Sequence, residues 1–376
     1  MREGSVAQKT FSQEIPFEYR MNLIVIQPVI NGKQRNMIFD TGAPNVLSTS
    51  LANEMKLEVK AKQKTMDSQG ANSDLGFTSV PIITIGNVDF INTCAAIADF
   101  DKTPEMKALH IDGIIGANLM KRATWTIDFQ NKKINFSSAP DTSKSITNAP
   151  KIKFISNITG TPIIDVKLDG ITDGLIVFDT GSNGDITGTE RAFRKLKKKN
   201  KIQSYIWNYG NYSAGLYGIG KPDTNFTAVV NNVEIGDIKL NRTRVDFSKG
   251  NVKTVGLQFT SNYKTTIDWK KKTITLQEFT KYSNLPFLSL GFTVKFENEK
   301  IVVASVYPNS DAAQKGLLVG LEVVSINQHL LTNNLIDIYD TFHTKKVIHD
   351  GTNVVLIKDE KGNEQQLEIL YESILK

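Results

Sequence analysis

Apolar and polar residues alternate over short runs along most of this chain, which is the spacing of β-strands. Runs rich in Val, Ile, Thr and Phe recur up to about residue 278 and are bounded by Gly, Asn and Asp. This pattern is typical of strands that bury one face. Two stretches have helical spacing instead, "SLANEMKLEVK" from residue 50 and "TERAFRKLKKKN" from residue 189. We therefore predict a mainly β protein with little helix.

The strand pattern occurs twice. "FDTGA" begins at residue 39 and "FDTGS" at residue 178, and "TIDFQNKKINF" (126–136) matches "TIDWKKKTITL" (266–276) at an offset of 140. Gly116 of "DGIIG" matches Gly256 of "KTVG" at the same offset. Residues 14–140 and 151–280 are thus predicted to be two copies of one unit, each a small closed barrel, joined by a Ser- and Pro-rich linker at 137–150.

Composition is that of a globular protein with more than one domain. The chain has 376 residues, of which 40% are hydrophobic and 22% charged. The net charge of +6 comes partly from a lysine run beside the second helical stretch. The run comprises Lys195, Lys197, Lys198, Lys199 and Lys201. No nucleic-acid motif accompanies it, so a solvated helix face is favoured and no nucleic-acid partner is expected.

Several kinds of chemistry are disfavoured by residue type. Cys94 is the only cysteine, which excludes an intrachain disulfide and a zinc site built on cysteines, and we expect a small buried thiol on a strand. We predict no metal and no cofactor. No apolar run is long enough to span a membrane. The segment "SVAQ" (5–8) is similar to a signal-peptidase site, so we expect an exported protein of the periplasm or cell envelope.

The repeated Asp-Thr-Gly suggests a specific reaction. Asp40 and Asp179 each follow an apolar strand and precede a Gly that permits a tight turn. Two carboxyl groups brought face to face share one proton, because like charges at contact distance cannot both ionise. One carboxylate can then accept a proton from water while the other donates to a carbonyl oxygen. An Asp turn closing an ordinary hairpin explains one such motif, but two at matched positions favour a paired site.

These motifs resemble the retropepsin-like aspartic proteases of bacteria, with two copies in one chain as in the bilobal, pepsin-like arrangement. The resemblance covers about two-thirds of the chain and implies that Asp40 and Asp179 are the catalytic pair, whose sharing of a proton is established for that family. It also implies that Thr41 and Thr180 interlock across the pseudo-two-fold axis. Gly42 and Gly181 would allow the backbone to approach the two carboxylates. Ala43 and Ser182 complete the two motifs. The second copy departs from the family pattern at Thr254, where a large apolar residue is usual.

The family covers its cleft with a β-hairpin flap. The resemblance places a flap at 67–74 in the first copy, with Gln69 and Gly70 as candidates. The second copy has "YGNYSAGLYGIG" (209–220) at the equivalent position. There Tyr209, Tyr212 and Tyr217 are candidates for contact with substrate, and an ordinary surface hairpin is the alternative. Because Ser182 carries a hydroxyl and Ala43 does not, we expect Ser182 to favour ionisation of Asp179 and leave the shared proton on Asp40.

Residues 284–376 resemble a PDZ domain. "VYPNSDAAQKGLLVGLEVVSINQ" (306–328) matches its Pro-x-Ser-x-Ala…Gly-Leu…Ile-Asn stretch, with Gly-Leu-Glu at 320–322 in place of Gly-Asp. The resemblance makes Ser289, Leu290, Gly291 and Phe292 a loop that binds the carboxylate of a peptide C-terminus. The segment 334–346 has helical spacing and would form a wall of the peptide groove. A structural cap on the protease is the alternative.

The combined prediction is an aspartic endopeptidase that takes protein or peptide substrates and acts as a monomer. Its PDZ-like unit would bind the C-termini of substrates or partners. The alternative is an inactive peptide-binding scaffold that keeps the fold.

Overall fold

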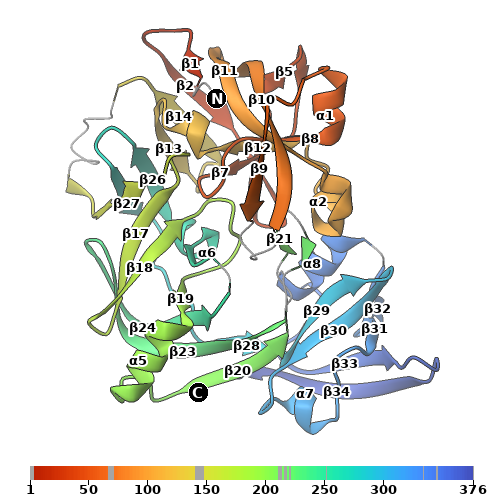
Figure 1. The fold of residues 1–376 in the computed structure, drawn as a ribbon. Helices are drawn as coiled ribbons and strands as arrows, with labels where there is room; N and C mark the ends of the chain where they lie inside the picture. Colours follow the sequence, from red (N-terminus) through yellow and green to blue (C-terminus); the bar gives the residue numbers. More distant parts are fainter. Residues whose placement is uncertain are drawn as a thin grey trace.

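The chain folds into two lobes and a C-terminal unit, each built largely of strands (Figure 1). The computed structural model describes residues 4–66, 72–139, 148–210, 214–215, 218–219, 222–250, 252–332, 334–343 and 346–375. The prediction of a mainly β protein is confirmed. In Figure 1 lobe 1 is red to orange, lobe 2 is green, and the C-terminal unit is blue.

Lobe 1 is organised around β12 (Gly113–Gly116), which lies between β7 (Met37–Asp40) and β8 (Val46–Ser48). β12 runs parallel to β7, in a register that pairs Gly116 with Asp40. The end of β7, which carries Asp40, therefore lies beside Gly116 at the end of β12. The remaining strands of this sheet are β1 (Ser5–Val6), β3 (Glu18–Arg20), β4 (Leu23–Ile26), β5 (Val29–Ile30), β6 (Lys33–Gln34), β9 (Ala61–Met66), β10 (Asn72–Ile85) and β11 (Val88–Ala98).

Lobe 2 repeats this plan. β18 (Ile171–Phe178) leads into Asp179 and runs parallel to β25 (Thr254–Val255), as β7 does to β12. The sheet order is β19-β24-β23-β17-β18-β25, with β16 beside β17 and β20 beside β23. The other strands of lobe 2 are β16 (Ile155–Ser156), β17 (Pro162–Leu168), β19 (Thr187–Thr189), β20 (Tyr205–Gly210), β21 (Ala214–Gly215), β22 (Gly218–Ile219), β23 (Asp223–Ile235) and β24 (Ile238–Ser248).

A third sheet joins the lobes along their pseudo-two-fold axis. Its order is β15-β27-β26-β13-β14-β2, so strands of the second copy form one half and strands of the first copy the other. At its centre the repeated "TID" segments pair antiparallel, with Thr126 opposite Thr266 and their hydroxyls 2.9 Å apart. The strands are β2 (Ser12–Pro16), β13 (Thr124–Asp128), β14 (Lys133–Ser137), β15 (Lys151–Lys153), β26 (Tyr263–Asp268) and β27 (Thr273–Glu278).

One continuous apolar core fills both lobes. Trp125, fully buried, stacks on Phe136 at 4.4 Å between ring centroids and also packs against Phe39, just before Asp40. Residues of both repeats belong to this core, so the two lobes fold on each other. The C-terminal unit has a separate core that includes Leu290, Val303 and Ile369.

The two predicted helices are present but shorter than the sequence pattern. α1 (Thr49–Glu54) begins where the Ser48 hydroxyl accepts from the Leu51 amide, and it ends before Lys56, whose positive φ breaks the helix. α5 (Glu190–Lys198) carries most of the lysine run on its solvent face. Short helical turns escaped the prediction because three to five residues show no periodicity. They are η1 (Phe100–Lys102), α2 (Pro104–Ala108), α3 (Ala117–Met120) and α6 (Leu257–Thr260).

The C-terminal unit is a curved sheet with two helices. The strand order β28-β34-β33-β31-β30-β29 makes β29 an edge strand, and β32 pairs with β31. α8 (Leu335–His343) falls within the segment predicted to be helical, and α7 (Asp311–Gln314) is short. The strands are β28 (Leu288–Ser289), β29 (Phe292–Glu297), β30 (Lys300–Val306), β31 (Glu322–Ile326), β32 (His329–Leu330), β33 (Gly351–Lys358) and β34 (Glu364–Ser373).

Two further features complete the description. Cys94 is a half-buried thiol on β11, and burial raises its pKa. Among the described residues, none of the helices is both long and apolar enough to cross a membrane.

Candidate active site

Asp40 and Asp179 come together at the junction of the lobes. Each lies at the carboxyl end of its strand, β7 or β18, and the lobes face each other there. A hydrogen bond links the two carboxyl groups. Asp179 is buried and Asp40 is half-buried. The structure therefore brings together the predicted pair, and the threonines that follow them, 139 residues apart in the chain, are also in contact.

Reciprocal hydrogen bonds between Thr41 and Thr180 lock the two loops. The Thr41 amide donates to Thr180 Oγ1, and the Thr180 amide donates to Thr41 Oγ1, each at 3.0 Å. The Thr41 hydroxyl then donates to the carbonyl of Phe178 (2.7 Å), and the Thr180 hydroxyl to that of Phe39 (2.9 Å). Both threonines are fully buried. The distance between the aspartates is thus set by backbone groups on either side of the axis.

Glycine is required after each Asp-Thr because the opposite carboxyl group occupies the space of a side chain. A Cβ at Gly42 would lie 2.6 Å from Asp179 Cγ, and one at Gly181 would overlap Asp40 Cγ. Any side chain would push the two aspartates apart. The glycine amides also face their own carboxylates, at 2.6 Å from Gly42 to Asp40 and 2.8 Å from Gly181 to Asp179.

The electrostatics of the pair favour a shared proton. Burial raises the pKa of Asp40, although the amides of Gly42 and Ala43 oppose that shift. Burial also raises the pKa of Asp179, and the negative charge of Asp40 raises it further. The pair is therefore expected to keep one proton at a pH where a free aspartate is ionised.

The expected role of the Ser182 hydroxyl is wrong. It lies 3.3 Å from the Thr254 hydroxyl and accepts from the Gly184 amide at 3.4 Å, so it is directed away from Asp179. Backbone amides lower the pKa of both aspartates and so do not favour one over the other. The argument from the Ser182 hydroxyl that the shared proton lies on Asp40 therefore loses its support.

The contact of Ser182 explains why Thr254 departs from the family pattern. In lobe 1 the equivalent positions are Ala43 and Ile114, both apolar. In lobe 2 they are Ser182 and Thr254, and the two hydroxyls satisfy each other. The polar substitution in one loop is therefore matched by a polar residue in the other, and the packing of the loop is preserved.

Asn45 and Asn118 support the loop that follows Asp40. The Asn45 side chain accepts from the Gly116 amide at 2.7 Å, and the Asn45 amide donates to the Asn118 side chain at 2.7 Å. Gly116 itself passes so close to Pro44 that a Cβ would overlap the Pro44 carbonyl group. Neither asparagine is a candidate from sequence, because an isolated Asn carries no motif.

Both lobes contain a hairpin at the positions where flaps were predicted. In lobe 1, β9 and β10 pair up to Met66 opposite Asn72, and Gln69 and Gly70 lie outside the described residues. In lobe 2, β20 and β23 pair up to Gly210 opposite Asp223. Tyr212 and Tyr217 lie outside the described residues as well. Tyr209 is on β20 and is 59% exposed, which leaves its ring available to a ligand.

The predicted carboxylate loop connects β28 to the edge strand β29. Gly291 has a φ of +82°, which favours glycine, and its amide donates to the Ser289 hydroxyl at 3.0 Å. Leu290 and Phe292 are buried in the core of the unit, and Phe292 packs edge-on against Phe342 of α8. The loop is therefore next to the helix that was predicted to wall a groove.

Comparison with known proteins finds a family match within the first lobe. Residues 26–119 match the family model described as "Aspartyl protease"; this segment contains Asp40 and β12 and ends before lobe 2. A solved structure that matches is a retropepsin-like aspartic protease from Rickettsia conorii, 19% identical, covering 36% of this chain and 96% of that chain, with a TM-score of 0.27. No curated protein matches. Through its first lobe, this chain is similar to the aspartyl proteases.

Proposed function

We propose that this protein is an aspartic endopeptidase in which Asp40 and Asp179 activate one water molecule. The observation that carries the proposal is that the carboxyl groups of Asp40 and Asp179 lie face to face, each filling the space that a side chain at Gly181 or Gly42 would need. Burial raises the pKa of both, which supports a shared proton. The ionised carboxylate takes a proton from water while the water oxygen attacks the peptide carbonyl carbon. The protonated carboxyl donates to the carbonyl oxygen, and a second proton transfer to the nitrogen releases the amine.

The loops around the pair suit this chemistry. The Thr41–Thr180 contacts and the brace from Asn45 fix the carboxyl groups before substrate arrives, so little reorganisation is needed during reaction. The alternative is a peptide-binding scaffold without activity. Retention of both aspartates, both glycines and the shared proton favours an enzyme, because a scaffold has no need of two buried carboxyl groups that repel each other.

Substitution of either aspartate tests the proposal. Asp40→Asn and Asp179→Asn should each lower the rate of cleavage of an unfolded protein by about a thousandfold or more, because each removes the shared proton. The double variant should lose little beyond either single variant, since the pair acts as one unit. Product formation is followed by mass spectrometry, with and without a statine-type inhibitor.

The matched control for that experiment is Asp165→Asn, at a residue of β17 outside the two catalytic loops. It should cleave as the wild type does. Substantial cleavage by either dyad variant, or cleavage that the inhibitor does not reduce, would rule out this mechanism.

We also propose that the C-terminal unit binds peptides by their terminal carboxylate. The support is the loop Ser289–Phe292 at an edge strand beside α8, where an added strand could pair. Peptides with a free C-terminus should bind at least about tenfold more tightly than amidated peptides, because charge-assisted hydrogen bonds to loop amides are lost. Isothermal calorimetry on the Asp179→Asn protein measures both. Equal affinities would show that the loop does not recognise a terminus.

A further inference from the structure

Lobe 1 contacts the loop that carries Asp179. That loop continues through Gly181 and Ser182 to Asn183, whose side-chain amide donates to the carbonyl of Met21 at 3.3 Å. Met21 and Asn22 form the turn between β3 and β4 of lobe 1. The two lobes therefore touch at this point, close along the chain to Asp179.

The C-terminal unit reaches the same point through α8. Hydrogen bonds join the side chain of Tyr339 to those of Asn22 and Asn183. Tyr339 is half-buried, and burial raises its pKa to about 12, so the hydroxyl remains neutral and can donate to one Asn while accepting from the other. α8 also contacts α2 of lobe 1, and Figure 1 shows the two helices beside each other. A residue of the third unit thus joins both lobes beside the catalytic loop.

A second contact fixes the unit against lobe 2. The Asn208 side chain on β20 donates to the Ser305 hydroxyl on β30 at 3.0 Å, and both residues are almost completely buried. Gly210 approaches the same strand so closely that a Cβ would lie 2.6 Å from the Ala304 carbonyl oxygen. The base of the lobe 2 hairpin is therefore packed onto the C-terminal unit.

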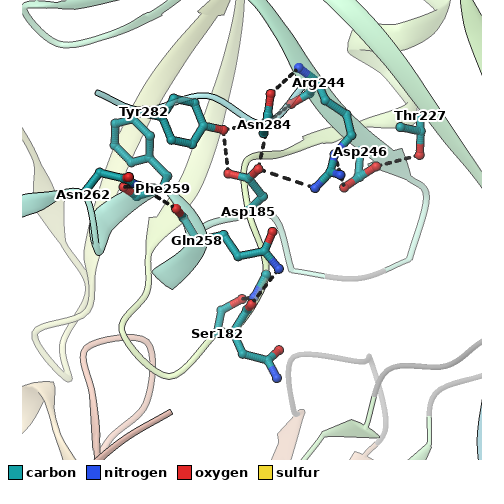
Figure 2. A network of polar contacts seen from close by, with 12 residues as sticks. Ser182, Asp185, Thr227, Arg244, Asp246, Gln258, Phe259, Asn262, Tyr282 and Asn284 are labelled. Atoms are coloured by element: carbon teal, nitrogen blue, oxygen red, sulfur yellow. Dashed lines mark hydrogen bonds and ion pairs between the residues drawn. The ribbon is translucent and has the colours of Figure 1, made fainter. Parts of the chain in front are cut away.

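The connecting segment is anchored as well (Figure 2). Asp185, 3% exposed, accepts from the Tyr282 hydroxyl (2.7 Å) and the Asn284 amide (2.8 Å), and Arg244 lies 3.5 Å from it. The Arg244 guanidinium also covers the ring of Phe287 at 4.4 Å. The chain that leads into the C-terminal unit is thus held by a buried polar network on lobe 2, which opposes free swinging of the unit.

From these contacts we propose that the C-terminal unit is a fixed wall of the substrate cleft and that Tyr339 limits how far a peptide extends past the Asn183 end. The inference rests on the proposed protease function. Tyr339 contacts Asn183, which lies a few residues after Asp179, and Asn22 of lobe 1, so the unit reaches the second catalytic loop on its Asn183 side. Peptides that extend far past this side of the aspartates would therefore be cleaved more slowly, and Tyr339 is a specificity-determining residue.

Two series of peptides test this. Both share one cleavable core, and one is lengthened stepwise at its N-terminus, the other at its C-terminus. For the wild type, kcat/KM should fall by about tenfold or more with length in one series only. Tyr339→Ala should remove most of that fall, and Tyr339→Phe, which keeps the ring, should retain it. Leu370→Ala, at an exposed residue of the same unit, should behave as the wild type does.

Thermal unfolding establishes that each variant is folded, and Tyr339→Leu, with its shorter side chain, replaces Tyr339→Ala with the same expectation if that variant does not fold. Equal dependence on length in the two wild-type series would overturn the inference, as would an unchanged asymmetry in the shortened variant. Both results require cleavage that is lost in Asp179→Asn. Absence of any such cleavage in every series would overturn the proposed function and this inference together.

Discussion

Two carboxyl groups can be held at contact distance only if every neighbouring residue allows it. Gly42 and Gly181 leave room for the opposite aspartate, and the fully buried Thr41 and Thr180 exchange equivalent hydrogen bonds across the axis. The residues that follow differ, since Ala43 packs against the apolar core and Ser182 turns its hydroxyl to Thr254. The difference between Ala43 and Ser182 therefore does not decide which aspartate holds the proton, and the sequence does not reveal where the Ser182 hydroxyl points.

The raised pKa of the pair makes folding stability depend on pH. A carboxyl group with a raised folded-state pKa stabilises fully below the unfolded pKa, about 3.9, and that contribution is lost as pH rises through the folded value. Asp179→Asn removes the like charge, so it should gain stability relative to the wild type as pH rises from about 4 to 7. Urea unfolding across this range measures the difference, and a difference that does not change with pH would contradict the shared proton.

At the scale of elements, the sequence predicts the longer repeated segments and misses short turns and long-range contacts. The two Asp-Thr-Gly strand ends, the glycine partners at 116 and 256, and the helices after each motif were predicted because each has a matching copy or a clear period. α3 and α6 are copies of each other at an offset of 140, but four residues are too few to show a period, and α2 has neither a copy nor a period. Likewise the contacts of Tyr339 and Asn208 join segments about a hundred residues or more apart, and no local pattern encodes them.

The network at Asp185 links the second catalytic loop to the segment before β28, and its contribution can be measured (Figure 2). Tyr282→Phe leaves Asp185 without one of its donors and should lower the free energy of unfolding by about 1–3 kcal/mol. Tyr263→Phe is the matched control, because Tyr263 packs on the same ring, Phe259, and has no comparable hydrogen bond to a carboxylate among the described residues. Equal effects in the two variants, by urea unfolding, would show that the hydroxyl of Tyr282 is not needed.

The whole molecule consists of three parts that contact one another. The lobes share one core and one central sheet, and the C-terminal unit keeps its own core while touching both lobes through α8 and β30. This unit and the segment before it contact Asn183 and Asp185, which lie a few residues after Asp179 in the chain. Substrate binding, the position of the unit and the geometry of the aspartates should therefore be coupled, since all three depend on the same loop.

The coupling of the lobes to each other depends on the strands that pair at the pseudo-two-fold axis. There the buried hydroxyls of Thr126 and Thr266 lie 2.9 Å apart, each satisfying the other. Thr126→Val or Thr266→Val alone leaves a buried hydroxyl without its partner and should lower the free energy of unfolding by about 1–3 kcal/mol. The double variant removes both polar groups and should cost clearly less than the sum of the two. Urea unfolding of the four proteins gives the coupling energy. Strict additivity would mean that the two hydroxyls do not interact.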